Sequence, residues 1–245
     1  MIFNQFSRKQ KLFIVLFGVF LTNAIIAEII GVKIVSIEKT LGFSPLNLTT
    51  FWGDQWDLNQ TAGALNWPIV FITSDIINDY FGKKGVKFIS YTTAVFVAYS
   101  FLIIYAATLL VPADFWIAVN AKSGNINESF KLIFRQGLGI ITGSLAAFLV
   151  SQLLDAYVFE KIKSRTGNKH IWLRATGSTL ISQLIDSFLV IGIAFFIFGD
   201  WTPGQWLNVS LNNYLYKFIV AILFTPLLYL VHYIIERYLH NEQMN

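Results

Sequence analysis

The sequence predicts an all-α, polytopic membrane protein: a bundle of six transmembrane helices with both termini cytoplasmic. Hydrophobic residues make up 55% of the 245 positions and charged residues only 13%, a balance too apolar for an ordinary soluble domain. Six apolar stretches are each long enough for a span of ~20 residues. They lack the alternating pattern of a membrane β-barrel, so we expect a single transmembrane domain over residues 1–245.

The six predicted helices are continuous apolar runs with approximate ranges 12–32, 65–81, 88–111, 132–159, 175–198 and 214–235. Pro68 falls in the first turn of the second helix, where a missing N–H costs least. Pro226 should kink the sixth helix. The segment 33–64 is long for a connection in a compact bundle, so we expect an ordered lid or interfacial helix there.

The basic residues predict the orientation of the bundle. Cytoplasmic connections of membrane proteins carry an excess of Lys and Arg. Twelve of the eighteen basic residues fall at the N-terminus, in the second and fourth connections, or after the sixth helix; they are Arg8, Lys9, Lys11, Lys83, Lys84, Lys87, Lys161, Lys163, Arg165, Lys169, Arg174 and Arg237. This distribution favours cytoplasmic termini.

Several classes of chemistry are excluded by composition. The chain has no Cys, which excludes disulfides, thiolate metal sites and cysteine nucleophiles. The three His lack metal-ligand spacing, and there is no phosphate-binding loop, so the chain carries no ATPase of its own. We therefore expect no catalytic residues, no metal and no cofactor. The net charge of +4 does not require a nucleic acid partner, because basic connections orient membrane proteins.

Two neighbouring predicted helices carry nearly the same polar motif. The fourth contains Gln152 and Asp155 within Ser-Gln-Leu-Leu-Asp, and the fifth contains Gln183 and Asp186 within Ser-Gln-Leu-Ile-Asp. A carboxylate in hydrocarbon costs at least about 2.5 kcal/mol, so it must face protein, water or a ligand. The repeated motif predicts a polar site between the two helices, of the kind transporters build near the bilayer centre.

The matching motifs run antiparallel, so they do not lie at one depth. Asp155 is about four residues from the inner end of its helix and Asp186 about eleven, which separates them by on the order of 10 Å at ~1.5 Å per residue. Gln152 and Gln183 come closer to a common level.

The second predicted helix adds Asp75, Asn78 and Asp79, which share one face, and the first adds Asn23 and Glu28. A site lined with carboxylates and amides accepts neutral or cationic ligands rich in donors. The adjacent N–H donors of a guanine-like edge fit a carboxylate in a bidentate fashion, and aromatic rings can stack on the base. One buried Asp can serve as a mere helix-to-helix hydrogen bond, but five acids exceed what packing needs.

Three stretches carry a family resemblance: Thr22-Asn23, the stretch from Thr73 to Lys84, and the block from Gln152 to Asp186 with its Trp172-Leu173-Arg174 and Ser178-Thr179. They resemble the queuosine precursor transporter family, also described as the putative vitamin uptake transporter family. The block from Gln152 to Asp186 is the specific part. The chain departs from the family at Asp79, where Glu is common, and at Ala175, where Asn is common.

The resemblance implies import of a queuosine precursor, a 7-deazaguanine such as 7-cyano-7-deazaguanine, across the cell (inner) membrane for salvage into tRNA modification. The expected partners are then a small-molecule 7-deazapurine substrate and the lipid bilayer.

On this hypothesis the pocket lies between the first, second, fourth and fifth helices. Its candidate substrate-binding residues are Asp186, Gln183, Asp155, Gln152, Asn78, Asp75, Asp79 and Asn23. Asp186 and Gln183 hold the donor edge of the base, whereas Asp155 and Gln152 complete the site or take a coupling proton. The candidates for gating or coupling are Glu28, Arg174, Trp172 and Ser178, with Arg174 and Trp172 at the cytoplasmic gate.

Other interpretations stay open. The family is similar in size and span count to the substrate-binding subunits of energy-coupling-factor vitamin importers, so an ATPase module or a homo-oligomer is an alternative to a solitary carrier. A cation channel or proton antiporter would move protons without any heterocycle. An intramembrane aspartyl protease needs two Asp close enough to share a proton, but its Gly-x-Gly-Asp motif is missing and the depth offset opposes it. We therefore expect no enzyme.

Overall fold

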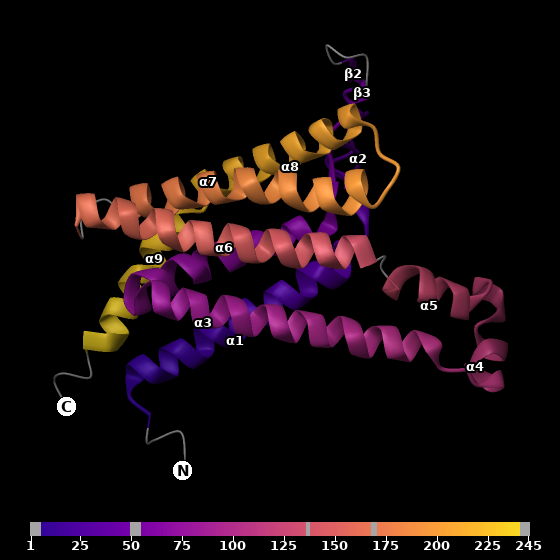
Figure 1. The fold of residues 1–245 in the computed structure, drawn as a ribbon, viewed down its shortest axis with the longest axis horizontal. Helices are drawn as coiled ribbons and strands as arrows, with labels where there is room; N and C mark the ends of the chain where they lie inside the picture. The colour runs from indigo at the N-terminus through magenta and orange to yellow at the C-terminus, as the bar shows by residue number, and fades with distance from the viewer. Residues whose placement is uncertain (1–5, 50–54, 136–137, 168–170, 241–245) are drawn as a thin grey trace.

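Residues 6–49, 55–135, 138–167 and 171–240 are described by the computed structural model of the chain. Long helices lie side by side as a bundle, with shorter helices and strands projecting at one end (Figure 1). In this part of the chain, four helices are long and apolar enough to cross a membrane, and one bent pair of helices makes a fifth candidate. The chain is therefore an all-α, multi-pass membrane protein, as predicted. The count of six spans stays a prediction.

α1 (Arg8–Ile30) begins ahead of the predicted start at residue 12 because Ser7 caps it. The Ser7 hydroxyl accepts a hydrogen bond from the Gln10 backbone N–H, and the Gln10 side chain accepts one from the Ser7 N–H. This reciprocal capping box satisfies two donors that a helix start otherwise leaves without partners. The buried face of α1 includes Phe20 and Ala24.

α3 (Trp67–Leu109) holds the second and third predicted helices on either side of a break at Gly82. Gly82 has φ 66° and ψ −176°, a conformation open essentially only to glycine. A Cβ on Gly85 would lie 3.4 Å from the Ile77 side chain, whereas residues eight apart in a straight helix are separated by ~12 Å. The chain therefore folds back at Gly82, which places a connection where the sequence predicted one.

The connector between α1 and α3 is ordered by two antiparallel strand pairs. Its elements are β1 (Ile34–Ser36), α2 (Ile37–Thr40), β2 (Leu48–Thr49), β3 (Gln55–Trp56), β4 (Asn59–Thr61) and the 3-10 turn η2 (Ala62–Asn66). β1 pairs with β4, with Ile34 opposite Thr61, and β2 pairs with β3. A Cβ on Gly63 would lie 2.4 Å from the Ala27 carbonyl oxygen, so only glycine lets the connector close onto α1.

The buried side chain of Glu38 holds two parts of this connector together by hydrogen bonds. Its carboxylate accepts hydrogen bonds from the Leu58 backbone N–H at 2.6 Å and from the Ser36 hydroxyl at 2.9 Å. Burial works to raise the pKa of Glu38, but the bonds from the Leu58 backbone and the Ser36 hydroxyl outweigh it and lower the pKa. The carboxylate form therefore stabilises the connector.

The predicted helix over 132–159 is divided between two helices. The first is α5 (Ile126–Phe134), which follows the short helices α4 (Asp114–Val119) and η3 (Ala121–Ser123). Its C-terminal cap, Arg135, has a non-helical backbone. The long helix α6 (Leu138–Thr166) then runs the length of the bundle (Figure 1).

α7 (Ile171–Ile191) packs along α6 and ends in a π-helical turn, η4 (Gly192–Ile197). α8 (Pro203–Leu223) begins well before the predicted start at residue 214, because Thr202 and Gln205 form a second capping box. α8 and α9 (Thr225–His240) meet at a bend of 48°. The kink predicted at Pro226 is thus confirmed.

The start of α1 and the end of α9 lie at the same end of the bundle, beside the α6–α7 connection (Figure 1). Arg8 Nη1 donates to the Tyr238 carbonyl oxygen at 2.8 Å, which joins the two helices there. This end carries most of the basic residues that predicted the cytoplasmic side, with Lys169 outside the described residues. The cytoplasmic location of the termini stays a prediction.

Candidate functional site

Polar side chains are buried along the facing surfaces of α3, α6, α7 and α8, where an ordinary bundle would be apolar. Six of the predicted substrate-binding residues are each at most 6% exposed; they are Asp75, Asn78, Gln152, Asp155, Gln183 and Asp186. Buried polar groups of this kind need hydrogen-bond partners from the protein, water or a ligand.

Gln152 and Asp155 join α6 to its neighbours. The Ser74 hydroxyl on α3 donates to Gln152 Oε1 at 3.0 Å. On the other side, the Ser182 hydroxyl of α7 donates to Asp155 Oδ1 at 3.1 Å, and the hydroxyls of Ser178 and Thr179 lie near this carboxylate.

The hydroxyl partners of Asp155 fix its depth relative to Asp186. They precede Asp186 by four to eight residues on α7, which corresponds to ~6–12 Å along the helix axis. This spacing agrees with the predicted offset of the two carboxylates. It opposes a proton-sharing pair such as an aspartyl protease needs.

Asp186 forms a buried ion pair that the sequence analysis missed. Lys217 Nζ on α8 lies 2.5 Å from Asp186 Oδ2, and the two side chains are 4% and 3% exposed. The Lys217 ammonium also lies over the Trp67 ring, 5.1 Å from its centroid. The sixth helix was predicted to begin at 214, only three residues before Lys217, whereas α8 begins at Pro203, which puts Lys217 well inside the helix. The signal for that start was the Thr202–Gln205 capping box.

Glu28 brings α1 to the same region. Its carboxylate lies near the Ser144 hydroxyl of α6 and interacts electrostatically with Asp186 and Lys217. The intramembrane acid of the first predicted helix thus lies close to the second motif.

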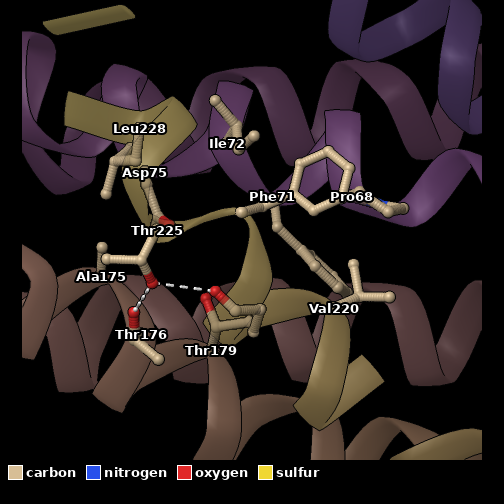
Figure 2. Close-up of a pocket in the computed structure, with 12 residues that line it drawn as sticks. Pro68, Phe71, Ile72, Asp75, Ala175, Thr176, Thr179, Val220, Thr225 and Leu228 are labelled. Carbon is tan, nitrogen blue, oxygen red and sulfur yellow. Dashed lines mark hydrogen bonds between the residues drawn. The ribbon is translucent and has the colours of Figure 1, made fainter. Parts of the chain in front are cut away.

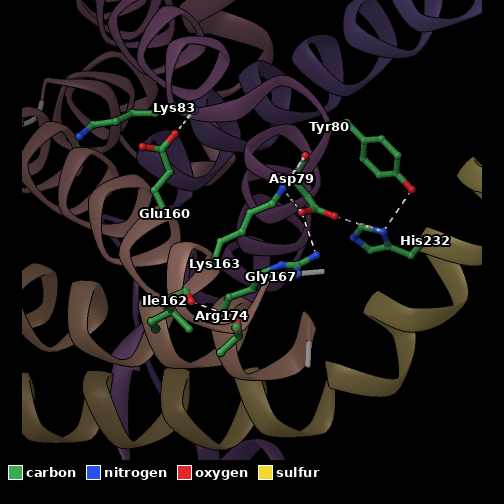
Figure 3. A network of polar contacts seen from close by, with 10 residues as sticks. Asp79, Tyr80, Lys83, Glu160, Ile162, Lys163, Gly167, Arg174 and His232 are labelled. Atoms are coloured by element: carbon green, nitrogen blue, oxygen red, sulfur yellow. Dashed lines mark hydrogen bonds and ion pairs between the residues drawn. The ribbon is translucent and has the colours of Figure 1, made fainter. Parts of the chain in front are cut away.

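Asp79 is held by basic residues at the end of the bundle that carries the α6–α7 connection (Figure 3). Its Oδ1 accepts from Arg174 Nη2 at 2.8 Å and from Lys163 Nζ at 2.6 Å, and His232 Nδ1 lies 3.9 Å from Oδ2. This network joins α3, α6, α7 and α9. Of its members, Lys163 and His232 were missed by the sequence analysis.

Two further contacts lie beside the Asp79 network: a pair of stacked rings and a backbone hydrogen bond to Glu160. The Tyr80 hydroxyl lies 3.2 Å from His232 Nδ1, and the two rings stack at a centroid distance of 5.2 Å. Beyond the break at Gly82, the Lys83 backbone N–H donates to Glu160 at 3.1 Å (Figure 3). No spacing in the sequence pointed to His232, since α9 contributes it from far along the chain.

Several buried polar atoms have no hydrogen-bond partner within the described residues. They are acceptors and donors of α3 and α7 and include Asp75 Oδ1, both side-chain polar atoms of Asn78, Gln183 Oε1, Ser187 Oγ and Arg174 Nε. An unpaired buried polar group costs about 1–3 kcal/mol. Such a concentration indicates atoms that a ligand or water would satisfy.

A narrow pocket lies beside Asp75, at the bend between α8 and α9, with a cavity volume of about 20 Å³ (Figure 2). Its lining residues come from α3, α7, α8 and α9 and are Pro68, Phe71, Ile72, Asp75, Ala175, Thr176, Thr179, Val220, Ala221, Phe224, Thr225 and Leu228. The wall is mostly apolar, with two phenylalanine rings, one carboxylate and three threonine hydroxyls. Small-molecule sites have such a sparse polar lining, although the cavity here has room for only about one water molecule.

Three predicted site residues lie apart from this constellation. The Asn23 side chain donates to the Val19 carbonyl of its own helix at 2.9 Å. Trp172 is 46% exposed and lies outside the buried stripe of α7. Asp79 is neutralised by Arg174 and Lys163. The remaining candidates, including Ser178 on α7, are buried where the helices pack against one another.

The chain matches the family model described as putative vitamin uptake transporter over residues 61–231. A protein of Bacillus subtilis strain 168 named probable queuosine precursor transporter is 30% identical over 174 residues, covering 70% of this chain and 71% of that protein. The queuosine precursor transporter of Escherichia coli K12 is 26% identical, with coverage of 76% and 80%. A probable queuosine precursor transporter of Haemophilus influenzae is also 26% identical, with coverage of 71% and 68%.

No solved structure matches the chain. The matched residues 61–231 run from just before α3 into α9 and include Asp79, its partners Lys163 and Arg174, both Gln–Asp motifs and Lys217, whereas His232 lies just beyond them. Together with the apolar helices, these matches give the chain a transport role in a membrane. The chain therefore belongs to the queuosine precursor transporter family, also described as the putative vitamin uptake transporter family.

Proposed function

We propose that the chain imports a 7-deazaguanine precursor of queuosine, such as 7-cyano-7-deazaguanine, across the cell (inner) membrane for salvage into tRNA modification. The observation that carries the proposal is the group of unpaired buried acceptors, Asp75 Oδ1 and Gln183 Oε1, in a chain whose relatives bear that name. A deazaguanine presents adjacent N–H donors that such acceptors can receive.

The substrate enters the polar zone between α3, α6 and α7. Asp75 lines the pocket beside the Phe71 ring, so the carboxylate takes the donor edge while the aromatic ring packs on the base. Asp186 and Gln183 contribute further acceptors from α7, and Gln152, Asp155 and Asn78 complete the polar wall.

The Asp79 network is the gate at the predicted cytoplasmic end. Arg174 and Lys163 join α3, α6 and α7 through one carboxylate, so breaking these bonds lets the helices separate there. Ser178 and Asp155 lie on the path between this gate and Asp186, and Trp172 borders the gate from the exposed side of α7.

Uptake of labelled 7-cyano-7-deazaguanine into cells that cannot make it tests the proposal. Asp186→Asn keeps the size of the side chain but removes the charge that both the substrate and Lys217 use, so uptake should fall at least about tenfold, the loss expected for one charged hydrogen bond. Asp200→Asn changes an exposed Asp and is the matched control.

Both variants must be present in the membrane at the level of the native chain. Asp186→Asn cells that take up the base at the control rate would remove that residue from the site. Native cells with no uptake at all would remove the substrate class.

A further inference from the structure

A second pocket lies at the end of the bundle away from both termini, where the connector between α1 and α3 meets the first turns of α8 (Figure 1). Its cavity volume of about 430 Å³ falls within the ~300–1,000 Å³ of small-molecule sites. Asp75 and Gln183 are not among its lining residues, so the binding site proposed above leaves this pocket without a role.

Carboxamide side chains dominate the polar lining of this pocket, which we call the amide pocket. Five carboxamides and one carboxylate line it; they are Gln55, Asn59, Gln205, Asn208, Asn212 and Asp57. Ile34, Val209 and the Trp201 indole supply its apolar surface. No Lys, Arg or His lines it within the described part of the chain, so nothing there would offset the cost of enclosing an anion.

The two walls of the amide pocket are joined by a direct hydrogen bond. Asn212 Nδ2 on α8 donates to the Asp57 carbonyl oxygen of the connector at 2.6 Å. Asp57 is held in turn, because its Oδ1 accepts from the Asn47 backbone N–H at 2.7 Å. Asn59 lies in β4, which pairs with β1. The lining is therefore built by ordered elements on both sides.

Asn208 is the side chain that points to a ligand. It is only 8% exposed and lines the pocket, yet its amide makes no hydrogen bond within the described residues. A buried amide needs partners for its carbonyl oxygen and for its NH2 group. The amide pocket is the space from which those partners can come.

The lining also indicates which chemical class fits. A carboxamide presents an acceptor and a donor side by side, so it pairs with a neutral ring that carries a donor and an acceptor on adjacent positions. The cyclic amide of a deazaguanine is such an edge, with an N–H next to a carbonyl. A phosphate-bearing nucleotide would find no cation to pair with, so the pocket suits the uncharged base.

We propose that the amide pocket is a docking site where the uncharged base binds before it reaches the buried acceptors of α3 and α7. The proposal rests on the import function proposed above: with the Asp79 network as the inner gate, this pocket lies on the side from which the substrate enters. Hydrogen bonds between neutral groups are weaker than those to a carboxylate. The base is therefore held less tightly here than at Asp75.

Labelling of single cysteines in the purified full-length chain tests this site, because the native chain has no Cys. Ile34→Cys places a thiol in the pocket lining, and Leu48→Cys places one in the same connector outside the lining; both positions are 47% exposed. 7-Cyano-7-deazaguanine should slow the reaction of a maleimide with Ile34→Cys and leave that of Leu48→Cys unchanged. The concentration that gives half protection should stay the same when Asp75→Asn is added, because the two sites are separate.

Asn208→Leu, added to Ile34→Cys, removes the amide at nearly constant size. It should raise the concentration for half protection at least about fivefold, the loss of one neutral hydrogen bond. Asn120→Leu replaces an Asn at the end of α4 and is the matched control, with no change expected. Guanosine 5′-monophosphate should give no protection, because the pocket has no cation for its phosphate.

Three results would overturn the proposal. Equal protection of both thiols would show that the connector closes over a base bound elsewhere. Loss of protection on adding Asp75→Asn would place the base at Asp75 alone, and an unchanged half-protection concentration in Asn208→Leu would remove the amide from the site.

If Asn208→Leu fails to fold, the ligands decide: protection by guanosine 5′-monophosphate equal to that by the base contradicts a pocket for an uncharged ring. An Ile34→Cys chain that takes up the base but shows no protection also overturns the docking site. Native chain that takes up no base contradicts the import function itself, which is a separate result.

Discussion

Lys217 and Asp186 are each buried at a cost that only the other offsets. Removing one partner of a buried ion pair leaves an uncompensated charge and destabilises a protein by about 3–5 kcal/mol, whereas replacing both with apolar residues is often nearly neutral. We therefore expect Lys217→Met and Asp186→Leu each to lower the melting temperature clearly, and the double variant to lower it far less than the two losses together.

Thermal unfolding of the four proteins in one detergent measures this coupling. Lys122→Met replaces an exposed Lys and should leave the melting temperature unchanged. Losses that simply add in the double variant would show that the two side chains do not stabilise each other.

The identity of the buried acids could be predicted from the sequence, but their partners could not. A carboxylate in a long apolar run must be buried against something polar, which identified Asp75, Asp155 and Asp186. Lys217 and His232 come from α8 and α9, whose pairing with α3 and α7 depends on how the helices pack. For Asp79, the charge could be predicted from the sequence, whereas the two basic residues that hold it, Arg174 and Lys163, could be identified only from the structure.

At the scale of single elements, the break in α3 depends on Gly82. Its φ of 66° with ψ near 180° would cost a residue with a side chain on the order of 1–3 kcal/mol. Gly82→Ala should therefore lower the melting temperature, even though its Cβ would meet nothing closer than a Glu160 oxygen at 4.0 Å.

Gly18→Ala is the control for this prediction, because Gly18 lies within α1 with open space around it. Alanine favours a helix there, so the melting temperature should stay or rise slightly. If Gly82→Ala and Gly18→Ala change the melting temperature equally, the backbone conformation at Gly82 does not require glycine.

The connector between α1 and α3 should loosen in acid. The folded state lowers the pKa of Glu38, so its carboxylate contributes stability above the unfolded value of about 4.3. This contribution is lost as the pH falls from there through the lower, folded-state pKa. The protection factor of the Leu58 amide, its hydrogen-exchange rate compared with that of an unprotected amide at the same pH, should fall over that interval in the native chain. Glu38→Gln should show low protection at every pH, and a native protection factor that is flat across the interval would contradict the assignment.

Local sequence features predicted some helix boundaries correctly and would have predicted others. The Pro226 bend rests on a missing donor, and the apolar runs gave the long helices. The predicted starts of α1 and α8 were too late because they followed the apolar runs alone. The capping boxes at Ser7 and Thr202 mark the true starts. The strand pairs of the connector have only two or three residues each, too few to produce a periodic pattern.

At the scale of the whole molecule, polar openings lie at both ends of a tightly packed middle. One, of about 430 Å³, is lined by the connector and α8 and includes Asp57, Asn208 and Asn212. The other, of about 510 Å³, surrounds Asp79 and His232. The buried acceptors lie between them, the arrangement that alternating access requires.

The most direct measurement is equilibrium binding of labelled 7-cyano-7-deazaguanine to the purified chain and to Asp75→Asn. If the buried acceptors form the substrate site, the native chain binds saturably, Asp200→Asn binds as tightly, and Asp75→Asn binds at least about tenfold more weakly, the loss of one charged hydrogen bond. Equal affinity of native chain and Asp75→Asn, with both folded, would contradict the account.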